Sequence, residues 1–189
     1  MSLQVPVFVA LLALSPRPSA HPLPGWAETV EEHRARLASF ATDVAAVART
    51  RAEAGILIGI AWHESGFAPD VDAGKCYLER GWKSRCDAGR AISAWQLQGG
   101  FTEDREVWRT SRRAAATEAL RRVHRSLGAC QKNEPDTRLA AYASGRCTTG
   151  HKAARELHAA VKKALSLMPG PEMPVVRVAP ARKPTGAGT

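Results

Sequence analysis

One acidic residue stands at the end of an apolar stretch of this sequence. Glu64 follows the run ILIGIAWH at residues 56–63 and precedes Ser65. Burial among apolar side chains disfavours an ionised carboxylate and raises its pKa, as a general acid working near neutral pH requires. The alternative is a helix-terminal glutamate whose carboxylate simply faces solvent. The apolar pattern alone leaves both interpretations open.

Other catalytic chemistries fit the sequence less well. His63-Glu64 begins an HExxH zinc motif, but Phe67 occupies the position of the second histidine. The chain has no glycine-rich phosphate loop, and cysteines that form disulfides cannot serve as nucleophiles. Asp70 and Asp72 lie near Glu64 on a loop, where we expect solvated or capping side chains rather than a second catalytic acid.

Three short motifs add to this interpretation. They read ESGFAP at residues 64–69, SAWQL at 93–97 and AYASG at 141–145. In this order they resemble the E-S-x-F-x-P, G-L-M-Q and A-Y-N-x-G segments of the soluble lytic transglycosylase family, which shares the goose-type lysozyme-like fold. The resemblance covers roughly residues 55–145. It implies a mainly α-helical, lysozyme-like domain, to which the cysteines of this sequence would add a disulfide-pinned loop.

The resemblance also implies residue roles. Glu64 would be the single catalytic acid and base, and Ser65 would line the site and hold the sugar or the Glu64 turn. Gln96 would face the cleft near the scissile bond, and Tyr142 would hydrogen-bond the catalytic carboxyl. Trp95 would either stack on a sugar face or fill the core. No metal or cofactor is needed.

The implied activity is that of a peptidoglycan lytic transglycosylase, which cleaves the bond between N-acetylmuramic acid and N-acetylglucosamine and forms a 1,6-anhydro ring. If water attacked instead, the enzyme would be a lysozyme-type hydrolase. A non-catalytic relative that binds glycan or docks in an envelope assembly is the third possibility. Three departures from the family motifs leave these open: Ser93 or Ala94 replaces Gly, Trp95 replaces Met and Ala143 replaces Asn.

Hydrophobic periodicity predicts one mostly helical domain over residues 26–168. The predicted helices span residues 27–53, 104–127, 137–143 and 151–167. We expect Gly55 to end the first of them and Asp136 to cap the third. Residues 56–64 fit a strand or a buried helix, and the resemblance favours a helix. Residues 66–89 are expected to form a loop, and the 104–127 helix is expected to bury Val107, Trp108, Leu120, Val123 and Leu127.

The four cysteines indicate disulfides. No pair forms a CxxC motif, so structural zinc is disfavoured. Of three possible connectivities we favour Cys76–Cys86 and Cys130–Cys147, because each closes a local loop. The first of these would pin a wall over the cleft or would stabilise the fold only. Four unpaired thiols are the alternative.

The ends of the chain differ from the domain in composition. Residues 1–20 contain an apolar run of signal-peptide length, although no Lys or Arg precedes it and Pro18-Ser19-Ala20 is a poor cleavage triplet. We predict a signal peptide at residues 1–20, a linker at 21–25 and a flexible Pro-rich basic tail at 169–189. We therefore expect a secreted or periplasmic protein, with no transmembrane segment in the mature chain.

The charge balance is basic. The 189 residues include 27 Lys and Arg against 18 Asp and Glu, for a net charge of +9. Ordinary apolar content excludes a mainly disordered chain and a polytopic membrane protein. Positive charge suits binding to an anionic cell wall, and no recognised nucleic-acid motif is present. We therefore expect the protein to bind peptidoglycan rather than nucleic acid. We also expect a monomer. The arginines at 112–125 are typical of a solvated helix face, with wall or partner binding as the alternative.

Overall fold

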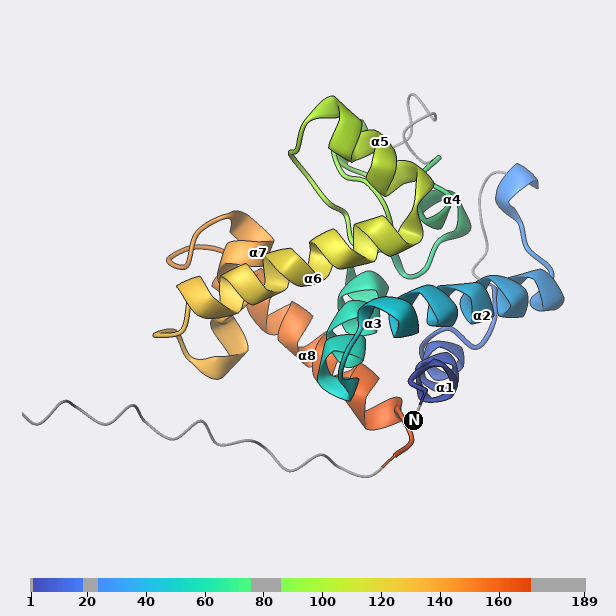
Figure 1. The fold of residues 1–189 in the computed structure, drawn as a ribbon, viewed down its shortest axis with the longest axis horizontal. Helices are drawn as coiled ribbons and strands as arrows, with labels where there is room; N and C mark the ends of the chain where they lie inside the picture. Colours follow the sequence, from blue (N-terminus) through green and yellow to red (C-terminus); the bar gives the residue numbers. More distant parts are fainter. Residues whose placement is uncertain (1, 19–23, 76–85, 171–189) are drawn as a thin grey trace, which may run out of the picture.

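The computed structural model describes residues 2–18, 24–75 and 86–170, and these ranges are mainly helical (Figure 1). Their only β-type pairing is an isolated bridge between Ile92 and Leu97. The α-helices are α1 (Gln4–Leu14), α2 (Val30–Val47), α3 (Arg51–Ser65), α4 (Pro69–Asp72), α5 (Thr102–Thr110), α6 (Arg112–Ala129), α7 (Ala140–Ser144) and α8 (His151–Leu167). Short 3-10 turns lie at η1 (Pro24–Trp26), η3 (Asp87–Gly89) and η4 (Pro135–Thr137). The predicted mainly α class is confirmed.

Helix α3 lies at the centre of the domain, where α1, α2, α6 and α8 contact it (Figure 1). Gly55 was expected to break a helix, but it lies inside α3. A side chain at Gly55 would clash with Leu165, and a Cβ at Gly59 would lie 2.6 Å from the Cα of Val161. The two glycines therefore allow α3 and α8 to approach closely, at a helix-propensity cost of about 1 kcal/mol each.

Two predicted long helices are each divided in the structure. The 27–53 prediction spans α2 and the start of α3, where the Thr50 hydroxyl accepts a hydrogen bond of 3.1 Å from the Glu53 amide. The 104–127 prediction spans α5 and α6, where the Ser111 hydroxyl accepts a hydrogen bond of 3.2 Å from the Ala114 amide. In both places a side-chain N-cap starts a new helix, and apolar periodicity does not register that break.

The other predicted elements have mixed outcomes. The helical interpretation of residues 56–64 and the last predicted helix at 151–167 are confirmed. Asp136 caps nothing, because it lies in η4 and α7 begins without a side-chain cap. Val107 is 51% exposed, so its predicted burial is wrong, whereas its neighbour Trp108 is buried. The predicted loop at 66–89 also contains the one-turn helix α4.

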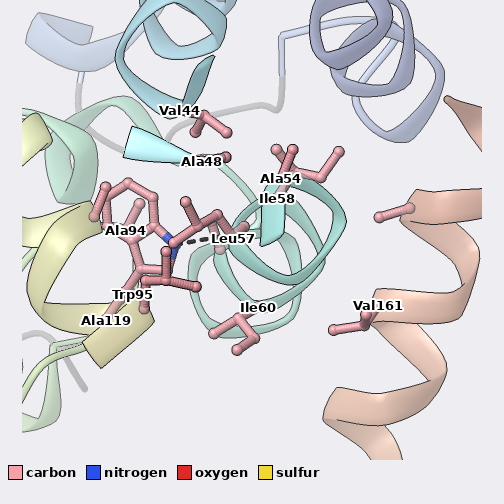
Figure 2. Close-up of a cluster of buried hydrophobic side chains, with 14 of the residues drawn as sticks. Val44, Ala48, Ala54, Leu57, Ile58, Ile60, Ala94, Trp95, Ala119 and Val161 are labelled. Carbon is pink, nitrogen blue, oxygen red and sulfur yellow. Dashed lines mark hydrogen bonds between the residues drawn. The ribbon is translucent and has the colours of Figure 1, made fainter. Parts of the chain in front are cut away.

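An aromatic cluster joins α2 and the segment after α3 to the turn around Trp95. The ring of Phe40 lies edge-on to Phe67 at 5.4 Å and tilted to Trp95 at 5.3 Å, between centroids. The Trp95 indole N–H donates a hydrogen bond of 2.8 Å to the carbonyl of Leu57 on α3, as Figure 2 shows. A buried indole needs such an acceptor, and the bond fixes the Trp95 turn against the central helix.

A buried ion-pair network links α2, α4 and α6. The Asp72 side chain is 1% exposed and accepts bonds of 2.7 and 2.8 Å from Arg112, with Arg36 at 3.4 Å. Arg36 also donates to Glu28, at 2.6 and 2.8 Å. The expectation of a solvated or capping Asp72 is therefore wrong. Its charge is committed to holding helices together, so it is not available as a second catalytic acid.

One of the two predicted disulfides can be compared with the structure. Cys130 and Cys147 are bonded, with 5.3 Å between their Cα atoms, which confirms that pairing. This disulfide closes the segment that contains η4 and α7. The predicted Cys76–Cys86 bond involves Cys76, which lies outside the described residues, as do most of the linker at 21–25 and the tail from 171 onward. Those predictions stay untested.

The predicted signal peptide forms α1, which contacts α2, α3 and α8. Its Val7 and Leu11 are fully buried, and the His33 imidazole makes a hydrogen bond of 2.8 Å to the Ser15 carbonyl. Yet α1 carries no charged residue, and Val5 on its outer side is 67% exposed. Apolar residues on every side suit a leader better than a surface helix. Removal of residues 1–20 remains a prediction.

Candidate functional site

A cleft of about 860 Å³ lies between the C-terminal end of α3, the Trp95 turn, α6 and α7. Glu64, Gln96 and Tyr142 all line it, although they are up to 78 positions apart in the chain. The structure thus brings together one residue from each of the three sequence motifs. Ala143, which stands where the family motif has Asn, lines the same cleft with a methyl group instead of an amide.

Glu64 occupies the last turn of α3, half-buried at the cleft wall. Burial raises the pKa of its carboxyl, and the charge of neighbouring His63 opposes this only in part. The carbonyl end of a helix also disfavours an anion. No hydrogen bond or ion pair from the described residues holds the carboxyl. A partly desolvated, unpaired carboxyl facing a cleft is suited to donating a proton to a bound molecule.

The turn that follows Glu64 is held by Ser65 and Gly66. The Ser65 hydroxyl donates to the Ala61 carbonyl at 2.7 Å and accepts from the Phe67 amide at 3.2 Å. Gly66 ends the helix with φ of +58°, and its amide donates to the Trp62 carbonyl. Ser65 is buried and does not line the cleft. Of the two roles implied for Ser65, the structure therefore agrees with holding the Glu64 turn.

Gln96 enters the cleft from a tight turn closed by paired backbone bonds between Ile92 and Leu97. Ser93 and Gln96 both have positive φ, +65° and +49°. The Gln96 amide group donates to the Ser93 carbonyl at 3.1 Å, which fixes its side chain against the turn. Such left-handed backbone costs energy in non-glycine residues and is common at binding sites. The predicted cleft position of Gln96 agrees with the structure.

Trp95 points the opposite way, into the core. It is 1% exposed, so its ring offers no face on which a sugar could stack. Of the two roles implied for Trp95, the structure agrees with core filling, and the buried position of its side chain does not support the substrate-binding role. Its backbone carbonyl, however, takes part in the cleft wall through a bond from Tyr142.

The Tyr142 hydroxyl donates a hydrogen bond of 3.1 Å to the Trp95 carbonyl, not to the Glu64 carboxyl. The expected hydrogen bond from Tyr142 to the Glu64 carboxyl is therefore wrong. Tyr142 still lies close to Glu64: burial raises the pKa of the Tyr142 phenol, and the Glu64 charge raises it further. The Ser126 hydroxyl accepts a bond of 3.0 Å from the Tyr142 amide, which fixes α7 against α6.

Sequence reasoning missed the side of the cleft that α6 and η3 form. Arg121, Arg122 and Arg125 line it from α6, and Asp87 lines it from η3. Their residue types carried no motif, and Asp87 stood in a stretch predicted only as loop. The helical spacing of the arginines did indicate a charged face. Only the packing of α6 in the fold shows that this face lines the same cleft as Glu64.

No family model, curated protein or solved structure matches this chain. The likeness to lytic transglycosylases thus depends on the three motifs and on the cleft that unites them. Both the lysozyme-like topology and the activity belong to the proposal below.

Metal chemistry was not expected from the sequence. Across residues 2–18, 24–75 and 86–170, no group of three His, Cys, Asp or Glu side chains is positioned to hold an ion. The same ranges contain no helix long and apolar enough to cross a membrane. The prediction that the protein needs no metal or cofactor remains a prediction.

Proposed function

We propose that this protein is a peptidoglycan lytic transglycosylase with a lysozyme-like helical fold and Glu64 as its single catalytic acid and base. The observation that carries the proposal is the convergence of Glu64, Gln96 and Tyr142 on one cleft. The raised pKa of Glu64 supports it, because the acid form is the one that must be present when substrate binds.

The proposed reaction uses one carboxyl twice. Protonated Glu64 donates its proton to the glycosidic oxygen between N-acetylmuramic acid and N-acetylglucosamine, and the bond from that oxygen to the anomeric carbon breaks. The N-acetyl group of the muramic residue stabilises the positive anomeric carbon. The Glu64 carboxylate then takes the proton of the C6 hydroxyl, whose oxygen bonds to the anomeric carbon. The 1,6-anhydro ring closes without water, and Glu64 is again protonated.

The remaining cleft residues would position the sugar. The Gln96 side chain projects from a rigid turn and carries both a donor and an acceptor for sugar groups. Ala143 supplies no polar group where the family has an amide, so we propose that polar contacts with the substrate come mainly from Gln96 and the α6 arginines.

The proposed setting is outside the cytoplasm, in the periplasm or in the medium. The Cys130–Cys147 bond supports it, because disulfides persist mainly in oxidising compartments. The leader-like composition of residues 1–20 supports the same location.

A lysozyme-type hydrolase is the second candidate, and Asp87 is the observation that favours it. Asp87 is the other acid that lines the cleft, and an inverting hydrolase needs a second carboxylate to activate water. However, the Asp87 carboxylate is bonded to Arg90 at 2.7 Å and accepts from the Gln98 amide at 3.3 Å. Both oxygens of this carboxylate are thus engaged with side chains and are less available to bind and orient a water. We therefore expect Asp87→Asn to retain cleavage, and abolished cleavage would favour the hydrolase.

The test of the proposal is mass spectrometry of muropeptides released from purified peptidoglycan, with Glu64→Gln in parallel. Anhydro products, lighter by one water than hydrolysis products, support the transglycosylase. Products with normal reducing ends would show that the protein is a lysozyme-type hydrolase instead. If the wild-type protein released no muropeptides from several wall types, the enzyme proposal would be wrong and a glycan-binding protein would be the better interpretation.

A further inference from the structure

The α6 wall of the cleft carries an arginine, Arg125, that forms no ion pair with the residues that the structure describes. Arg121 and Arg122 both pair with Glu118, at 2.6 and 2.7 Å. Arg122 also donates to the Gln98 carbonyl at 2.6 Å and lies over the Trp108 ring at 5.0 Å. These contacts give both side chains a structural role and leave Glu118 neutralised.

Arg125 differs from these neighbours. It lies one turn further along α6, is exposed and lines the cleft, and no carboxylate of the described residues is within ion-pair distance of it. Most other arginines around the cleft and the core are paired, including Arg36, Arg90 and Arg112. Among the described residues, Arg125 is therefore an unpaired guanidinium in the same cleft as the proposed catalytic acid.

We propose that Arg125 binds a carboxylate carried by the glycan strand, so that the site selects acidic glycan over neutral glycan. This inference rests on the proposed function and names the substrate class of that same site. A guanidinium recognises carboxylates with two parallel N–H donors. In a peptidoglycan strand the carboxylate has two sources. One is the stem peptide, and the other is the lactyl group that remains on the muramic residue when the peptide is removed.

The local charge agrees with an anionic ligand. Along this face of α6, Arg121, Arg122 and Arg125 outnumber the single acid Glu118, which leaves an excess of two positive charges. Asp87, the acid across the cleft, is paired with Arg90. Glu64 adds no negative charge in its protonated form. A strand with carboxylates would therefore meet a net positive wall on entering the cleft.

The test measures binding by calorimetry to the full-length Glu64→Gln protein, in which the proposed chemistry is blocked. Three ligands are compared: glycan strands with non-amidated stem peptides, strands stripped by an amidase, and a chitin hexasaccharide that carries no carboxylate. A second variant carries Arg125→Gln in addition to Glu64→Gln. The matched control is Arg155→Gln, which removes the same charge from an exposed position on α8 that does not line the cleft.

We expect Arg125→Gln to weaken binding of the peptide-bearing strands about 3- to 10-fold at low salt, with a smaller loss in higher salt. Binding of the chitin hexasaccharide should not change, and Arg155→Gln should have no effect on any ligand. An equal loss with stripped strands shows that the freed lactyl carboxylate takes the place of the stem-peptide carboxylate at Arg125. A loss confined to peptide-bearing strands assigns it to the stem peptide.

Three results would overturn the inference. They are unchanged binding in Arg125→Gln, an equal loss for the uncharged chitin oligomer, or an equal loss in Arg155→Gln. If the wild-type protein cleaves peptidoglycan while one of these holds, only the role of Arg125 is wrong. If none of the three ligands binds and no wall is cleaved, the proposed function is wrong as well.

Discussion

The Tyr142 hydroxyl donates a hydrogen bond of 3.1 Å to the Trp95 carbonyl, which ties α7 to the turn that carries Gln96. The Trp95 indole in turn donates to Leu57 on α3, the helix that ends at Glu64. Glu64, Gln96 and Tyr142 are thereby connected through Trp95. Trp95 stands where the similar motif of the lytic transglycosylases has Met, and its indole N–H makes a bond to Leu57 for which Met has no donor.

Tyr142→Phe should disturb this connection without changing the shape of the side chain. The Trp95 carbonyl would lose its side-chain donor, which costs about 1 kcal/mol in the free energy of unfolding. The cleavage rate should fall mildly, because the turn that positions Gln96 is less constrained. Urea denaturation and the initial rate of wall lysis measure the two effects. Ser126→Ala, which removes the bond to the Tyr142 amide, is the matched variant, and unchanged rates in both would remove α7 from the site.

Glu64→Gln should change the pH dependence of stability. Burial raises the pKa of Glu64 above its ordinary value of 4.5, so ionising this group in the folded protein is costly. The cost is absent below pH 4.5 and grows as pH rises through the raised pKa. Glutamine has no such cost. The Tm of Glu64→Gln should therefore match the wild type near pH 4 and exceed it near pH 8, as measured by calorimetry.

The matching control is Glu118→Gln, for which we expect the opposite change of stability at neutral pH. Hydrogen bonds from Arg121 and Arg122 lower the pKa of Glu118, so its ionised form stabilises the fold. That stability is present above the ordinary pKa and is lost as pH falls through the lowered one. Glu118→Gln should be destabilised at neutral pH. If the two variants showed the same trend with pH, the assigned environments would be incorrect.

Asp72→Asn should strongly destabilise the fold while sparing the chemistry. The change removes a buried charge that pairs with Arg112 and Arg36, although each arginine keeps one other carboxylate partner. We therefore expect a loss of about 2–3 kcal/mol in the free energy of unfolding. Because Asp72 does not line the cleft, cleavage per folded molecule should be retained. The exposed Asp104, which lies in the first turn of α5, provides the control Asp104→Asn. A stability loss of equal size in both variants would contradict the buried network.

Much of the helical framework was predictable, and the exceptions have local causes. Apolar spacing located α8 and the inner face of α2, because a surface helix has to bury one stripe. The same spacing ran through Thr50 and Ser111, where capping hydroxyls start new helices. Gly55 was mistaken for a breaker since sequence alone does not show that α8 crosses at that point.

The candidate site was predictable only where motifs existed. Glu64, Gln96 and Tyr142 were named from the sequence, and all three line the cleft. The direction in which the Trp95 ring points was not predictable, because it depends on the position of the Leu57 carbonyl and of the Phe40 ring in the fold. Asp87 was missed, and Arg125 was named only as part of a charged helix face with wall or partner binding as the alternative, since both residues belong to the cleft through packing and not through any local motif.

The most direct test of the central claim is muropeptide mass spectrometry on purified peptidoglycan with the wild-type protein and Glu64→Gln side by side. We predict 1,6-anhydro products from the wild type and a fall in their formation of at least about 100-fold in the variant, which lacks the proton donor but keeps the fold. Anhydro products formed at an equal rate by Glu64→Gln would contradict the assignment of Glu64 as the catalytic acid.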